Sequence, residues 1–148
     1  MLSAHYSLED LLVSDTATRL DIDNTPDAAA RNNLARLAQT LEEVHTALGK
    51  LPLVISSGYR SPRLNQAVGG AANSAHLLGL AVDFTVPHYG TVLQTAQAIA
   101  QAAIAFDKLI FEYGRWVHLA IADSSEQARG KLLSIGADRV YVDGLREV

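Results

Sequence analysis

The chain has 148 residues, of which 49% are hydrophobic, and it carries 12 basic and 16 acidic side chains for a formal net charge of −4. This length suffices for one sizeable core but not for two ordinary domains, so we expect a single domain over residues 1–148. The negative charge, without any basic run, argues against a nucleic-acid-binding protein, because such proteins gain affinity by neutralising phosphates.

The absence of cysteine excludes disulfides, thiolate metal sites and cysteine nucleophiles. Any metal must therefore be held by histidine, aspartate or glutamate. No segment approaches the run of about 18 apolar residues that a membrane span needs, and the first residues lack the pattern of a signal peptide. We expect a product that is cytoplasmic as synthesised, has no membrane partner and is a monomer.

The first half of the chain predicts helices around one strand. A weak capping box opens a short helix at 8–12, which ends in the polar residues 14–16. The longest predicted helix covers about residues 26–48, because leucine and valine recur there at spacings of three and four after a Thr-Pro-Asp start. An apolar run at 53–55 predicts a strand, and a Ser-Pro pair then opens a short helix at 62–69.

The second half of the chain predicts most of a sheet. A strand with alternating side chains covers 80–86, and an alanine-rich helix follows at 91–105. The β-rich runs at 108–113 and 116–122 surround a Gly-Arg pair, which is the pattern of a hairpin. Weaker strands follow near 131–135 and 139–142. Together the elements predict an α+β fold, with helices packed on a largely antiparallel sheet.

Three residues in this framework point to a metal site. Side chains alternate along a strand, so Asp83 and His118 each face away from the apolar side of their strands. His76 lies in a loop seven residues before Asp83, and Gly79 between them lets the backbone turn so that the side chains converge. Two neutral imidazoles and one carboxylate are a normal ligand set for catalytic zinc. The alternative is that each histidine is simply hydrogen-bonded. The remaining histidines lack a carboxylate partner in a ligand-like block and are expected to be structural: His5, His45 and His88.

The sequence around these residues resembles the zinc D-Ala-D-Ala carboxypeptidase and endolysin peptidase family. The resemblance covers residues 57–84 and 112–120, and residues 5–17 are similar to its phage-type branch. The family's S-x-H-x-x-G-x-A-x-D and W-x-H blocks are present as Ser74, His76, Gly79, Ala81 and Asp83, and as Trp116 and His118. This resemblance implies the Hedgehog-like fold of these carboxypeptidases, with Zn2+ bound by His76, Asp83 and His118.

The resemblance also implies an activity. The chain is expected to hydrolyse peptide bonds in the stem peptides of bacterial peptidoglycan, as a D,D-carboxypeptidase or as an endolysin-type endopeptidase. The lack of a signal peptide favours a phage or prophage lysis protein that reaches the cell wall after another protein opens the membrane. Two alternatives remain: a non-catalytic wall-binding or virion domain, and a dipeptidase specific for free D-Ala-D-Ala.

The general base is the point where the sequence departs from the family. The family has an acidic residue three positions before the second histidine, and here that position is Arg115. The nearest carboxylate is Glu112, which shares the face of His118 if residues 113–115 form a three-residue hairpin loop. With a two-residue loop Glu112 would miss the site. We predict Glu112 as the base, with a solvated hairpin residue as the alternative.

Three further residues are candidates for contact with substrate. Arg60 matches the family's arginine, which can bind a terminal carboxylate or stabilise the tetrahedral oxyanion, although it could instead form a structural ion pair. Ser74 can hydrogen-bond the substrate backbone or cap its own loop. Trp116 can form a wall of the substrate cleft, or only pack against its neighbours.

Overall fold

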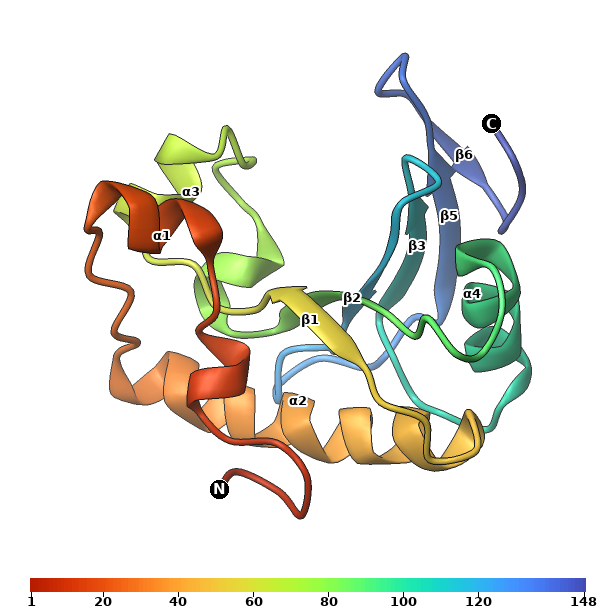
Figure 1. Cartoon of the computed structure of the whole chain (residues 1–148), viewed down its shortest axis with the longest axis horizontal. Coiled ribbons are helices and arrows are strands. Elements are labelled where there is room, and N and C mark those ends of the chain that lie inside the picture. Colours follow the sequence, from red (N-terminus) through yellow and green to blue (C-terminus); the bar gives the residue numbers. More distant parts are fainter.

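The computed structural model describes all 148 residues and has an α+β fold (Figure 1). The helices are α1 (Asp15–Leu20), α2 (Ala28–Ala47), α3 (Pro62–Ala67) and α4 (Val92–Gln101), with the 3-10 turns η1 (Glu9–Leu11) and η2 (Ala75–Leu78). The strands are β1 (Val54–Ser57), β2 (Ala81–Thr85), β3 (Lys108–Glu112), β4 (Trp116–Ala120), β5 (Lys131–Ile135) and β6 (Tyr141–Asp143). None of the helices is both long and apolar enough to cross a membrane.

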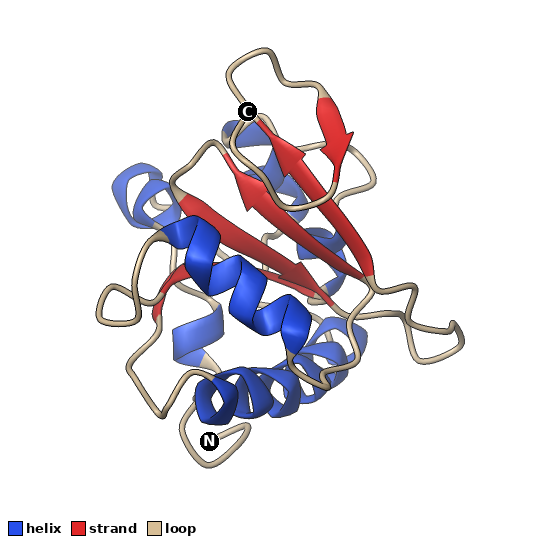
Figure 2. Cartoon of the chain, turned by 90° about the vertical axis from the view of Figure 1, so that its right-hand side faces the viewer, coloured by secondary structure: helices blue, strands red, loops and turns tan.

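The strands lie side by side in one sheet (Figure 2). Their order is β1-β2-β4-β3-β5-β6. Every neighbouring pair is antiparallel except β3 and β5, which run parallel. The predicted α+β class with a largely antiparallel sheet is therefore confirmed. The sheet also places β2 and β4, the strands that carry Asp83 and His118, next to each other, and neither is an edge strand.

The helix boundaries differ from the predicted ones where capping residues compete. The prediction that residues 14–16 end a helix is wrong, because the Ser14 side chain accepts a hydrogen bond from the Ala17 N–H and so caps the start of α1. Likewise α2 is capped by Asp27 rather than by Thr25, since the Asp27 carboxylate accepts from the Ala30 N–H. Both corrections follow from side chains that satisfy the free N–H groups of a first helical turn.

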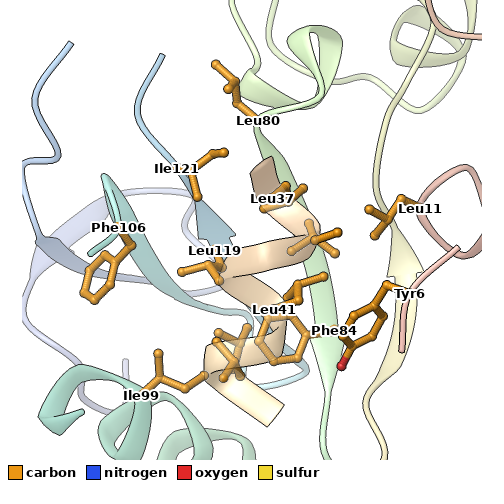
Figure 3. Close-up of a cluster of buried hydrophobic side chains, with 14 of the residues drawn as sticks. Tyr6, Leu11, Leu37, Leu41, Leu80, Phe84, Ile99, Phe106, Leu119 and Ile121 are labelled. Atoms are coloured by element: carbon orange, nitrogen blue, oxygen red, sulfur yellow. The ribbon is translucent and has the colours of Figure 1, made fainter. Parts of the chain in front are cut away.

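The main hydrophobic core lies between α2, α4 and one face of the sheet (Figure 3). Leu34, Leu37 and Leu41 of α2 are fully buried, as the spacing of three and four predicts. They pack in the same cluster as Phe84 of β2 and Leu119 of β4. Each such side chain contributes about 1.5–3 kcal/mol by its burial. Because strand side chains alternate, the residues between these apolar ones must point to the other face of the sheet.

Gly79 holds the turn that joins η2 to β2. Its φ is +72°, and a Cβ built on it would lie 2.5 Å from the carbonyl oxygen of Ala30 in α2. We expect Gly79→Ala to lower the free energy of unfolding by about 2–4 kcal/mol, because the left-handed backbone and the collision with backbone each cost about 1–2 kcal/mol or more. Urea unfolding measures this loss.

The matched control is Gly49→Ala. Gly49 has a φ of +77°, but a Cβ there would meet no atom within 4 Å. This variant should lose only the backbone contribution of about 1–2 kcal/mol. Equal losses for the two variants would contradict the argument from the close approach of Gly79 to α2.

Candidate metal centre

Three donor side chains converge on the sheet face opposite the main core. Asp83 of β2 and His118 of β4 are directly opposite each other in the antiparallel pairing, so their side chains share one face. His118 Nδ1 lies 2.9 Å from Asp83 Oδ1, and His76 Nε2 lies 3.3 Å from the same oxygen. All three ligand atoms lie within 4.8 Å of one another. The structure thus brings together the residues that the sequence selected.

His76 is held in one orientation by its backbone and by its ring. Its Nδ1 lies 2.7 Å from the carbonyl oxygen of Gly58, which can only accept, so Nδ1 carries the proton. The other ring nitrogen, Nε2, consequently faces Asp83 Oδ1 at 3.3 Å. The His76 N–H donates to Ser74 Oγ, and its carbonyl accepts from the Arg60 N–H. A metal-ligating histidine is commonly fixed in this way by a carbonyl behind it.

Asp83 is a buried carboxylate that is kept ionised. Only 5% of the residue is exposed. Burial opposes the charge, but hydrogen bonds with His118 and His76 outweigh it and hold the pKa of Asp83 well below its ordinary value. An ionised carboxylate beside two imidazoles is ready to share a cation with them.

Arg60 lies against the second oxygen of this carboxylate. Its Nη2 is 3.6 Å from Asp83 Oδ2, its Nε donates to Ser57 Oγ, and its Nη1 donates to Asn65 Oδ1. The ion pair considered as an alternative role for Arg60 is therefore present. Asn65 thus positions this guanidinium, and its own amide donates to the carbonyl of Ala71.

The hairpin between β3 and β4 has the three-residue loop, so Glu112 pairs with Trp116. Glu112 consequently shares the face of His118, and its Oε1 lies 3.4 Å from His118 Nδ1. Burial, more than any neighbouring charge, raises the pKa of Glu112 above its ordinary value. Arg115, at the position where the resemblance implies an acidic residue, is exposed in the turn and takes part in none of the ion pairs. The carboxylate beside the donor cluster therefore comes from Glu112.

Ser74 and Trp116 lie at the edges of the same region. Ser74 caps η2 through the hydrogen bond from His76 N–H, which is the loop-capping role considered above. Trp116 stands across from Glu112, and its buried indole N–H makes no hydrogen bond of normal geometry. Its ring centroid is 5.5 Å from that of Tyr113. Contact of Ser74 and Trp116 with a substrate stays a prediction.

Tyr141 of β6 is a neighbour of the site that the sequence did not reveal. Ile135 of β5 pairs with Glu112 on one side and with Tyr141 on the other, so all three side chains share one face. Burial, followed by the nearby Glu112 carboxylate, raises the pKa of Tyr141. No local motif marks this residue, because its placement depends on the parallel pairing of β3 with β5.

Comparison with known proteins agrees with this geometry. Residues 4–120 match the family model described as Peptidase M15, and this region contains His76, Asp83, Glu112 and His118. A zinc D-Ala-D-Ala carboxypeptidase from Streptomyces albus G is 38% identical over 76 residues. That match spans 51% of this chain but 28% of the Streptomyces protein. Because the family model covers more than half of the sequence, the chain belongs to the peptidase M15 family.

Proposed function

We propose that this chain is a zinc-dependent peptidase that hydrolyses peptide bonds in the stem peptides of bacterial peptidoglycan. The observation that carries the proposal is the cluster of His76, Asp83 and His118 with the Glu112 carboxylate beside it. Membership of a peptidase family and the resemblance to a zinc carboxypeptidase support the reaction class. The substrate class rests on the name of that relative, which specifies a D-Ala-D-Ala bond.

The donor set fits zinc. His76 Nε2, Asp83 Oδ1 and His118 Nδ1 are the atoms that would hold it, and two imidazoles with one carboxylate leave a fourth position open. When bound, zinc lowers the pKa of a water molecule to about 7 and polarises the carbonyl group that is attacked. The buried and ionised Asp83 supplies the negative charge that such a cation needs.

Glu112 and Arg60 supply the remaining chemistry. The Glu112 carboxylate would accept a proton from the attacking water and return it to the amide nitrogen as the peptide bond breaks. Its raised pKa suits this role, because a more basic carboxylate accepts a proton more readily. The guanidinium of Arg60, held by Ser57 and Asn65, would bind the terminal carboxylate of the substrate or the developing oxyanion.

Arg115 supports the alternative that the domain binds cell wall without cleaving it, because it replaces the acidic residue usual in the family. The position of Glu112 next to His118 weighs against this alternative, since a carboxylate is available from the other end of the hairpin loop. A third possibility, a dipeptidase for free D-Ala-D-Ala, uses the same chemistry on a smaller substrate.

One experiment tests the proposal against both alternatives. The purified protein is incubated with peptidoglycan, with defined stem peptides and with free D-Ala-D-Ala, each with added zinc and with a chelator, and products are identified by mass spectrometry. Release of D-alanine from stem peptides would indicate a carboxypeptidase, and release of cross-link peptides an endolysin-type enzyme. Turnover of the dipeptide alone would favour the dipeptidase. Bound zinc without any cleavage would favour the wall-binding domain and would refute the proposal.

A further inference from the structure

A second cluster of two histidines and a carboxylate lies away from the candidate active site. His5 comes from the N-terminal segment, and Glu42 and His45 come from adjacent turns of α2. Their ligand atoms all lie within 4.8 Å of one another, as in the first cluster. Figure 1 shows the N-terminal segment beside α2. We expected His5 and His45 to be structural because neither has a carboxylate partner in a ligand-like block of the sequence, but the fold brings the Glu42 carboxylate of α2 to His5 across 37 residues.

The Glu42 carboxylate is oriented by the N-terminal segment. Its Oε2 accepts hydrogen bonds from the His5 N–H at 2.7 Å and from the Ser3 hydroxyl at 2.5 Å. Its Oε1 faces His5 Nδ1 at 2.6 Å. The group is therefore a carboxylate with one oxygen held by two hydrogen bonds and the other directed toward the His5 imidazole.

The two imidazoles of the cluster stand close together. The ring centroids of His5 and His45 are 4.5 Å apart, and the rings are tilted by 45°. Two such rings repel each other when both are protonated, whereas both can be neutral donors to one shared cation. The side chain of His5 is 57% exposed, so an ion can reach the cluster and water can complete its coordination.

We propose that His5, Glu42 and His45 form a second metal site, for zinc or a similar divalent transition ion, that fastens the N-terminal segment to α2. Two imidazoles and a carboxylate suit such ions better than calcium or magnesium, which prefer oxygen ligands. Ligands on a tetrahedral ion with bonds near 2.0–2.1 Å lie about 3.3 Å apart, so His5 needs to move from its 2.6 Å contact by less than 1 Å. The exposed ring of His5 allows this movement.

Metal stoichiometry of the full chain tests the site. Zinc equivalents are counted by titration and by native mass spectrometry for the wild type, His45→Ala and His5→Ala. The control is His88→Ala, because His88 is an exposed histidine outside the cluster. We expect both cluster variants to bind one equivalent fewer than the wild type, or to bind it at least 10-fold more weakly, and His88→Ala to match the wild type. Circular dichroism verifies that each variant is folded.

The result is independent of the candidate active site. If that site failed to hold zinc, the wild type would bind one equivalent and His45→Ala none, so the difference of one would persist. Saturating zinc should also raise the melting temperature of the wild type by more than that of His5→Ala, because an ion that binds only the folded chain stabilises it. Equal stoichiometry and equal melting shifts in the wild type and both variants would show that the cluster is only a hydrogen-bonded pair, and would overturn the proposal.

Discussion

Replacing Glu112 by glutamine is expected to lower kcat by about 10²- to 10⁴-fold, the usual contribution of a general base. Glutamine keeps the size of the side chain on the face of His118 but cannot accept the proton of the attacking water. Zinc should remain bound, because Glu112 lies 3.4 Å from His118 Nδ1 yet is outside the cluster of three donors. Turnover of a stem peptide and zinc content are measured on the same preparation.

The control for this variant is Glu126→Gln, which makes the same chemical change at an exposed residue. It should retain the turnover and the zinc content of the wild type. If Glu112→Gln also kept full turnover, Glu112 would not be the base. If Glu112→Gln lost its zinc, the carboxylate would act in holding the metal rather than in moving a proton.

The direction of the Asp83 and His118 side chains could be predicted from the sequence, because strand alternation is a local rule. Asp83 and His118 each stand between buried apolar neighbours, and this pattern alone directs them to the opposite face of the sheet. Their direct pairing across β2 and β4 could not be predicted in this way. It depends on strands that are separated by a helix and by another strand in the chain.

The sequence left the length of the hairpin loop undecided between two and three residues, because the backbone of this loop is unusual. Tyr113 has a φ of 57° and Gly114 a φ of 66°. A tyrosine in the left-handed region is uncommon, so residue preferences did not decide between a two-residue and a three-residue loop. The structure has the three-residue loop. A shift of one residue in the pairing of β3 with β4 determines whether Glu112 shares the face of His118.

The remaining omissions concern contacts between distant segments. Glu42 is 37 residues from His5, so no local motif or residue spacing in the sequence could connect the two. Tyr141 lies beyond residues 4–120, the part that matches the family, and reaches the neighbourhood of Glu112 only through β5. Both examples require the assembled fold, since the strand and helix patterns describe each element separately.

Replacing Asp83 by asparagine is expected to weaken zinc binding by at least 100-fold and to abolish peptidase activity. Asparagine keeps the shape of the side chain but removes the charge that His76, His118 and Arg60 all contact. Changing a residue that only hydrogen-bonds a metal ligand typically costs 10- to 100-fold in metal affinity, and Asp83 is proposed as a direct ligand. The exposed Asp15→Asn serves as the control, because it removes the same charge far from the cluster in the sequence.

The titration with Asp83→Asn is best made in the His45→Ala background, so that the second proposed site contributes no zinc. There, zinc at 100 times its dissociation constant should stabilise the protein by about 2.7 kcal/mol when Asp83 is present, and by almost nothing when it is asparagine. Chelator should abolish activity in the parent, and zinc should restore it. Tight zinc binding by the Asp83→Asn protein would instead mean that the ion binds elsewhere. His76 and His118 would then be only hydrogen-bonding partners of a buried carboxylate.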